Sequence, residues 1–280
     1  MPKQILITGG TSGIGYELVK HFVTNGDSVV FTARNPEKAT DIQEKFQKLG
    51  FQVAFQIVDF ASFDSILSAA ANLSRNYPPF DVLINNAGTW EMQFSETRDS
   101  IETNFAVNHL APMLLTLELL PVLKTAPQCR IINTSSGAHR RNILVLEDLE
   151  FRNRPYDGVA TYSQSKLCNL LFSLHLQTEL AGSSVTVNTV HPGYVKTELF
   201  RNWENRNWEQ VPDAKTGAQS AIFAATSPTL EGKSGLYLYH SAEDPNLSPL
   251  AKDYSLALQL WNLSIAYFEK HAIQKQIRSL

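Results

Sequence analysis

The sequence predicts a doubly wound α/β fold, in which a mostly parallel β-sheet carries helices on both faces. Short apolar runs alternate along the chain with longer segments whose apolar residues recur at helical spacing. Runs such as Ile5–Ile7 and Val82–Ile84 are apolar at every position, as a strand covered on both faces requires. We therefore expect about seven strands, at Gln4–Thr8, Ser28–Ala33, Gln52–Val58, Asp81–Asn85, Arg130–Ser135, Ser184–Val190 and Gly235–His240.

Helices are expected between the first six of these strands. Ile14, Leu18 and Phe22 recur at helical spacing after the first strand, and Leu167 and Leu171 do so after the fifth. No repeat, low-complexity tract or linker-like change of composition interrupts the chain. We therefore expect residues 1–280 to form one domain, with a substrate lid at about 198–212 and a C-terminal helix at about 248–278.

The composition excludes several classes of protein. With 24 Lys and Arg against 27 Asp and Glu, the net charge of -3 offers no basic field for a nucleic acid. The two cysteines, Cys129 and Cys168, can build neither a disulfide framework nor a zinc site, and we expect no bound metal. The apolar segments are too short for a signal peptide or a membrane span, which predicts a cytoplasmic protein without a transmembrane segment.

A glycine-rich loop joins the first strand to the first helix. Gly9 can adopt the backbone angles of a tight turn, Gly13 has no side chain to block a pyrophosphate, and Gly15 lets the helix lie close to the strand. The free N–H groups of the helix N-terminus would then face phosphate oxygens. The alternative is a simple turn between strand and helix, because a glycine loop by itself is weak evidence.

Further motifs follow this loop in a fixed order along the chain. They are Asp59, Asn85-Asn86-Ala87-Gly88, Asn108, Ser135-Ser136, Tyr162-Ser-Gln-Ser-Lys166 and Pro192-Gly193. Together with the loop Thr8-Gly-Gly-Thr-Ser-Gly-Ile-Gly15, they resemble the short-chain dehydrogenase/reductase family, whose members are oxidoreductases with a Rossmann fold. The resemblance extends from Gln4 to about His240.

The resemblance implies a bound nicotinamide dinucleotide. Asp59 would bind the adenine amino group, and Val195 and Thr197 would hold the nicotinamide carboxamide. The full set of implied cofactor-binding residues is Gly9, Thr11, Ser12, Gly13, Ile14, Gly15, Arg34, Asp59, Phe60, Asn86, Ala87, Gly88, Tyr162, Lys166, Pro192, Gly193, Val195 and Thr197.

Arg34 indicates which dinucleotide binds. The second strand ends in Thr32-Ala33-Arg34, with no acidic residue that could accept hydrogen bonds from an adenosine ribose. A guanidinium at this position can pair with a 2'-phosphate, whereas an aspartate would repel it. We expect NADP(H) rather than NAD(H); the alternative is a solvent-exposed arginine at the end of the strand.

Four residues form the predicted catalytic group: Tyr162, Lys166, Ser136 and Asn108. Tyr162 and Lys166 are four residues apart in a helical pattern, so both side chains project from one face. A nearby ammonium and the oxidised nicotinamide would favour the phenolate of Tyr162, which could then exchange a proton with a substrate oxygen. Ser136 could donate to that oxygen. The resemblance implies that Asn108 bends its helix and holds a water linked to Lys166; the alternative is a buried asparagine bonded to backbone groups.

The retinol dehydrogenase-like branch of the family is the one that the chain resembles. The segments 146–156, 162–172 and 187–199 carry this likeness, and parts of the C-terminal region extend it. We expect an apolar or aromatic substrate pocket beyond the strand ends, to which Ser136, His139, Trp90, Tyr194, Phe200 and Trp203 contribute.

The predicted function is an NADP(H)-dependent oxidoreductase that interconverts an alcohol and an aldehyde or ketone. One alternative is a C=C reductase that resembles protochlorophyllide reductase, and the other is a noncatalytic protein that senses NADP(H). The C-terminal helix lacks charge over residues 254–268. It could pack on the domain, form a homo-oligomer contact or lie on a membrane surface.

Overall fold

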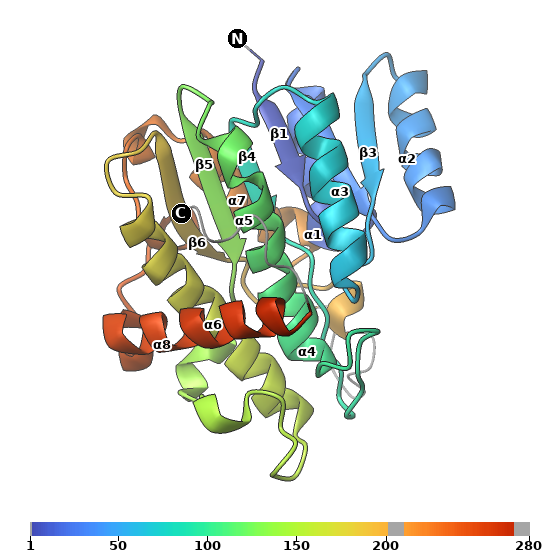
Figure 1. Ribbon diagram of the computed structural model, residues 1–280. Coiled ribbons are helices and arrows are strands. Elements are labelled where there is room, and N and C mark those ends of the chain that lie inside the picture. Colours follow the sequence, from blue (N-terminus) through green and yellow to red (C-terminus); the bar gives the residue numbers. More distant parts are fainter. Residues whose placement is uncertain (1, 201–209, 272–280) are drawn as a thin grey trace.

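One β-sheet organises the computed structural model, which describes residues 2–200 and 210–271 (Figure 1). The strands are β1 (Gln4–Ile7), β2 (Ser28–Ala33), β3 (Val53–Ile57), β4 (Val82–Asn85), β5 (Cys129–Thr134), β6 (Val185–His191), β7 (Tyr237–Tyr239) and β8 (Ala242–Glu243). They lie in the order β3-β2-β1-β4-β5-β6-β7-β8, and all neighbours are parallel except β7 and β8. The predicted fold class and seven strands are confirmed. The eighth strand was not predicted because its two exposed residues carry no apolar pattern.

Helices cover both faces of the sheet. Those that the structure describes are α1 (Gly13–Thr24), α2 (Pro36–Lys48), α3 (Phe63–Asn76), α4 (Thr103–Phe105), α5 (Ala111–Leu123), α6 (Gly158–Glu179), α7 (Ala214–Thr226) and α8 (Tyr254–Lys270). Figure 1 shows α3, α5 and α6 in front of the sheet, with α1 and α7 behind it. The strands alternate accordingly: Leu6 belongs to the core on one face, whereas Ile5 and Ile7 belong to the core on the other.

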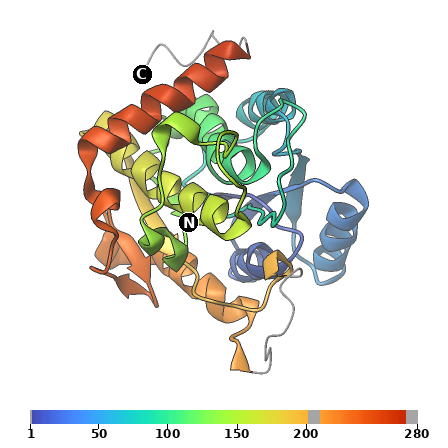
Figure 2. The ribbon, with the colours of Figure 1, turned by 90° about the horizontal axis from the view of Figure 1, so that it is seen from below.

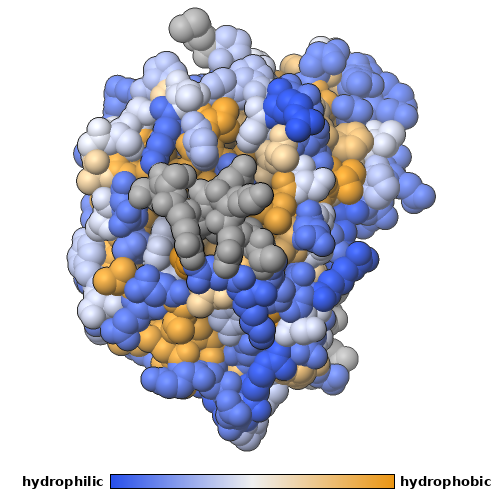
Figure 3. Space-filling view, viewed as in Figure 1, coloured by the Kyte–Doolittle hydropathy of each residue, from blue (hydrophilic) through white to orange (hydrophobic). Residues whose placement is uncertain are grey.

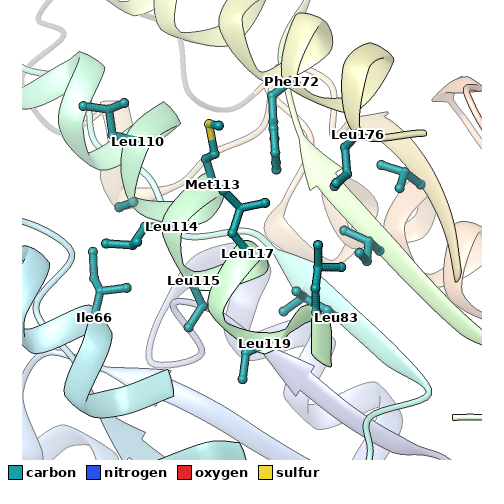
Figure 4. Close-up of a cluster of buried hydrophobic side chains, with 14 of the residues drawn as sticks. Ile66, Leu83, Leu110, Met113, Leu114, Leu115, Leu117, Leu119, Phe172 and Leu176 are labelled. Atoms are coloured by element: carbon teal, nitrogen blue, oxygen red, sulfur yellow. The ribbon is translucent and has the colours of Figure 1, made fainter. Parts of the chain in front are cut away.

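The larger core is built around α5. Its residues Met113 and Leu117 lie toward Phe172 and Leu176 of α6, and Leu83 of β4 lies nearby (Figure 4). All five side chains are at most 5% exposed. Burial of apolar surface contributes about 25 cal/mol of stabilisation for each Å², so these contacts stabilise the packing of α5 and α6 on the sheet.

α5 is the last part of a longer helix. α4, a π-helical segment Ala106–Leu110 and α5 form one continuous helix, Thr103–Leu123. Among the described residues, this is the one helix that is long and apolar enough to cross a membrane. The sequence analysis predicted no such segment. Of its most apolar window, 78% is buried inside the protein, as in the central helix of a packed core.

The helix α8 packs against α6, which confirms one of the expectations for the C-terminal region (Figure 2). Its buried side includes Leu260, Phe268 and Ser264, and the Ser264 hydroxyl lies 2.9 Å from Nε2 of His109. Tyr254 and Leu258 remain exposed. Hydrophobic patches among hydrophilic residues are visible on the face seen in Figure 3. The predicted C-terminal helix continues to residue 278, and its part beyond 271 lies outside the described residues.

Candidate active site

A cavity of about 960 Å³ lies at the carboxyl ends of the strands. It spans the place where β1 and β4 are neighbours and the chain continues to opposite sides of the sheet, which is where doubly wound sheets bind ligands. The structure brings every residue that we expected to bind a cofactor to the wall of this cavity: Gly9, Thr11, Ser12, Gly13, Ile14, Gly15, Arg34, Asp59, Phe60, Asn86, Ala87, Gly88, Tyr162, Lys166, Pro192, Gly193, Val195 and Thr197.

The glycine loop has the shape that a phosphate site needs. Gly9 and Gly13 have positive φ angles of 71° and 51°. A Cβ atom on Gly15 would overlap the carbonyl oxygen of Gly9, so only glycine lets α1 begin there. Ser12, which precedes α1, makes no side-chain capping bond, and the first turn contains no acidic residue. The first-turn N–H groups of α1 therefore suit an anionic group.

Hydrogen bonds join the glycine loop to the loop after β4. The hydroxyl of Thr8 accepts bonds from the backbone N–H groups of Asn86 and Ala87, both at 2.9 Å. The side chain of Asn86 donates to the carbonyl oxygen of Thr8 at 3.0 Å. These bonds therefore tie the end of β1 to the loop after β4 at the base of the cavity.

Two cations line the end of the cavity next to β2. Arg34 and Lys38 are both exposed, and among the described residues neither side chain has a carboxylate partner within salt-bridge distance. The side chain of Asn35 caps α2 by accepting the backbone N–H of Lys38 at 2.9 Å. Lys38 was not predicted. Its position four residues after Arg34, just inside a helix that starts at Pro36, is the signal that could have found it.

Tyr162 and Lys166 lie together on α6 at the opposite end. They are 6% and 4% exposed, and Nζ of Lys166 lies 5.6 Å from the centre of the Tyr162 ring. Burial raises the pKa of Tyr162 to about 12, against the smaller lowering effect of the Ser136 hydroxyl. Burial lowers the pKa of Lys166 to about 8. Burial therefore favours the phenol of Tyr162 over the phenolate.

The two serines after β5 have different surroundings. The hydroxyl of Ser135 donates to the backbone carbonyl of Lys166 at 2.7 Å and is buried. The hydroxyl of Ser136 accepts the backbone N–H of Ala138 at 3.2 Å, and Ser136 lines the cavity together with Tyr162, whose pKa its hydroxyl lowers. Ser136 is thus the serine whose hydroxyl influences the phenol.

The prediction that His139 contributes to the substrate pocket is wrong. Its ring is fully buried and does not line the cavity. Nδ1 lies 2.6 Å from the carbonyl oxygen of Ser136, and Nε2 accepts the backbone N–H of Ser248 at 3.3 Å. Both ring nitrogens therefore form hydrogen bonds with backbone groups: Nδ1 carries the proton and donates, and Nε2 accepts.

Asn108 lies just behind the cavity wall, in the π-helical segment. Its Oδ1 accepts the backbone N–H of Thr89 at 2.8 Å, and its Nδ2 donates to the carbonyl of Thr89 at 2.9 Å and to Ser165 at 3.0 Å. The side chain is therefore bonded as in our alternative interpretation. Gly88 separates it from Lys166: a Cβ on Gly88 would lie 2.9 Å from Asn108 Oδ1 and 3.4 Å from Lys166 Nζ.

The remaining substrate residues are only partly described. Trp90 and Tyr194 line the cavity. Phe200 ends a 3-10 helix, Glu198–Phe200, and Trp203 lies outside the described residues, as does most of the predicted lid. Cavity residues that the sequence did not single out include Glu91, Val107, Arg141, Val159 and Leu199.

Comparison with known proteins decides the family. A model of the short chain dehydrogenases matches residues 3–208. The chain belongs to the short-chain dehydrogenase family. Within it, this short-chain dehydrogenase is 36% identical over 275 residues to polyprenol dehydrogenase of Homo sapiens, covering 92% of this chain and 83% of that protein. It is 34% identical over 284 residues to retinol dehydrogenase 14 of Mus musculus, covering 94% and 84%. The retinol dehydrogenase-like branch is thereby confirmed.

Solved structures agree with this assignment. An uncharacterised protein from Mycobacterium paratuberculosis superposes with a TM-score of 0.78 at 30% identity, covering 95% of this short-chain dehydrogenase and 93% of that chain. A short chain dehydrogenase from Burkholderia cenocepacia in complex with NADP has a TM-score of 0.68 at 24% identity and covers 84% and 95%. The second likeness concerns the fold alone.

Proposed function

We propose that this protein interconverts an alcohol and an aldehyde or ketone with NADP(H), and that its substrate is apolar. The observation that carries the proposal is the position of Tyr162, one helical turn from Lys166, in a cavity that Ser136 and the glycine loop also line. A bound NADP(H) would supply or accept the hydride. Proton transfer then falls to the residues of the chain.

Tyr162 is the proposed proton donor in the reduction direction. A phenol with a raised pKa keeps its proton at neutral pH, so it can donate to the oxygen of a carbonyl substrate. Ser136, which lines the same cavity, donates a second bond to the same oxygen and stabilises the charge that develops there. Lys166, when protonated, places a positive charge near the phenol and favours the phenolate that remains.

Asn108 is proposed to support this group from behind. Its amide forms hydrogen bonds with both backbone groups of Thr89. Gly88, which has no side chain, lies between this amide and the amine of Lys166. A water held near Asn108 would complete a path for protons from Lys166 to solvent, as the family resemblance implies.

We infer a preference for NADP(H) from the pair Arg34 and Lys38. A guanidinium and an ammonium that have no carboxylate partner in residues 2–200 and 210–271 leave two positive charges at the end of the cavity next to β2. A 2'-phosphate carries enough negative charge to pair with both, whereas a ribose hydroxyl does not.

An apolar substrate is favoured by the cavity wall and by the relatives. Trp90, Val107, Val159, Tyr194 and Leu199 line the cavity. The relatives named above are a polyprenol and a retinol dehydrogenase, and both names describe long apolar alcohols. We infer the same class of substrate here. We also infer a single domain and a reducing compartment such as the cytoplasm, where the two buried thiols stay free.

The test is a screen that follows NADPH absorbance. Retinal, decanal, a steroid ketone and the cyclic enone 2-cyclohexenone are offered as substrates, with NADH in parallel. We expect turnover of the apolar aldehydes with NADPH. Saturation of the C=C bond in the enone, with its carbonyl intact, would favour a C=C reductase instead. Binding of NADPH without turnover of any carbonyl compound would favour a noncatalytic sensor.

A further inference from the structure

Two asparagines of one helix hold the loop between β4 and α4. Asn108 bonds to both the N–H and the carbonyl of Thr89, as described above. Asn104 does the same for Glu91: its Oδ1 accepts the N–H at 2.8 Å, and its Nδ2 donates to the carbonyl at 3.0 Å. Each amide therefore satisfies the backbone of alternate residues, as a neighbouring strand would, and the position of Trp90 between them is fixed.

Trp90 lies against the phenol ring of Tyr162. The ring centres are 4.9 Å apart and the planes are 25° from parallel, which is a stacked arrangement. The indole Nε1–H donates to the carbonyl oxygen of Gly158 at 2.7 Å. Since Gly158 is the first residue of α6, the indole is bonded to the same helix that carries Tyr162.

Gly158 permits this close approach. A Cβ atom at this position would overlap the carbonyl oxygen of Glu91 and the backbone of Met92. The φ angle of Gly158 is not positive, so close packing against the loop is what requires a glycine here. The loop and the start of α6 therefore meet backbone to backbone, and the indole covers the phenol at this junction.

We propose that Trp90 is a positioning residue for Tyr162, holding the phenol in one orientation on the cavity wall that it shares with Ser136. The proposal rests on the function proposed above and adds a role to a residue that the sequence suggested only as a substrate contact. A tyrosine side chain can rotate about two bonds, and stacking on one face of the ring restricts both. The hydrogen bond to the carbonyl oxygen of Gly158 fixes the indole of Trp90, and the fixed indole limits the rotation of the Tyr162 ring.

The two roles of Trp90 predict different kinetics. A positioning residue affects the chemical step for every substrate, whatever its size. A residue that only contacts substrate changes KM, and does so most for large apolar substrates. Propanal and decanal, as a small and a large aldehyde, separate these effects.

The experiment compares Trp90→Leu and Trp90→Phe with the wild type in NADPH-dependent reduction of both aldehydes. Trp261→Phe is the matched control, because that tryptophan packs on Phe172 and His175 away from the cavity. We expect Trp90→Leu to lower kcat at least about tenfold for both aldehydes. Trp90→Phe, which keeps a ring but loses the bond to Gly158, should have a smaller effect, and the control should keep full kcat.

A second variant addresses the junction without removing the indole. Gly158→Ala should displace the loop and lower kcat for both aldehydes, and the double variant with Trp90→Leu should lose less than the sum of the two effects. Unchanged kcat in Trp90→Leu, or a loss confined to the KM for decanal, would overturn the positioning role. If Trp90→Leu does not fold, Trp90→Phe and Gly158→Ala provide the test. A lower kcat for both aldehydes supports the positioning role, and an unchanged kcat overturns it. Tyr162→Phe separates the two proposals: full turnover in it would contradict the proposed function itself.

Discussion

Nζ of Lys166 lies 5.6 Å from the centre of the Tyr162 ring, and both side chains are buried. Burial shifts their pKa values in opposite directions. The pKa of Lys166 falls from 10.5 to about 8, whereas that of Tyr162 rises from 10.0 to about 12. Both shifts favour the neutral forms. The same burial therefore keeps the proton on Tyr162 at neutral pH and makes the ammonium of Lys166 easier to deprotonate.

This shift predicts a pH dependence of stability. Between pH 8 and pH 10 the unfolded chain keeps the proton on Lys166 and the folded chain loses it, so the free energy of unfolding should rise with pH on account of this residue. The contribution should reach about 2 kcal/mol. Urea unfolding of the wild type and Lys166→Met at pH 7.5, 8.5 and 9.5 measures it as a difference. Parallel pH curves for the two proteins would contradict the shift.

Removal of the Tyr162 hydroxyl should abolish turnover while the cofactor still binds. We expect Tyr162→Phe to lower kcat by about 10³-fold or more, because general acid catalysis contributes about 10²–10⁴-fold. Ser136→Ala should cost about 10²-fold, as loss of one donor to a developing oxyanion does. Steady-state kinetics give kcat, and NADPH fluorescence titration gives Kd. A Kd that rises as much as kcat falls would indicate a binding role instead.

The cations next to β2 should select the dinucleotide. Arg34→Ala is expected to raise the KM for NADPH about 10–100-fold, the usual value of a charge-assisted bond, and Lys38→Ala somewhat less. The KM for NADH should stay within about twofold in both. Arg75→Ala, an exposed arginine on α3 that does not line the cavity, is the control. Equal effects on both dinucleotides would remove the basis for NADP(H).

Gly15 should tolerate no side chain. Gly15→Ala places a Cβ against the carbonyl of Gly9, so α1 must move away from β1 and the phosphate site must distort. We expect loss of NADPH binding and a lower melting temperature. Gly182→Ala is the comparison, since Gly182 has a φ of 80° but open space around it. It should cost about 1 kcal/mol of stability and leave NADPH binding unchanged.

Local patterns were sufficient for much of the fold and the site. Buried parallel strands are recognisable in the sequence as short runs that are apolar at every position. Gly15, Tyr162 and Lys166 are recognisable by their spacing from neighbouring residues of the same motif. Seven of the strands, and the cavity residues that belong to the family motifs, could therefore be predicted. Lys38 was missed, because its relation to Arg34 depends on the start of α2 at Pro36.

His139 and Trp90 show what the tertiary structure alone decided. His139 follows Ser136 closely in sequence, yet its ring turns inward to Ser248, 109 positions away, because a buried imidazole needs partners for both nitrogens. Trp90 meets Tyr162 only after β4 and α6 are packed together, and Gly158 permits that contact. The sequence by itself determined the fold class, the family and the candidate reacting groups, since these depend on local order along the chain. Which side chains hold those groups in place depends on contacts between distant segments, and only the tertiary structure decided them.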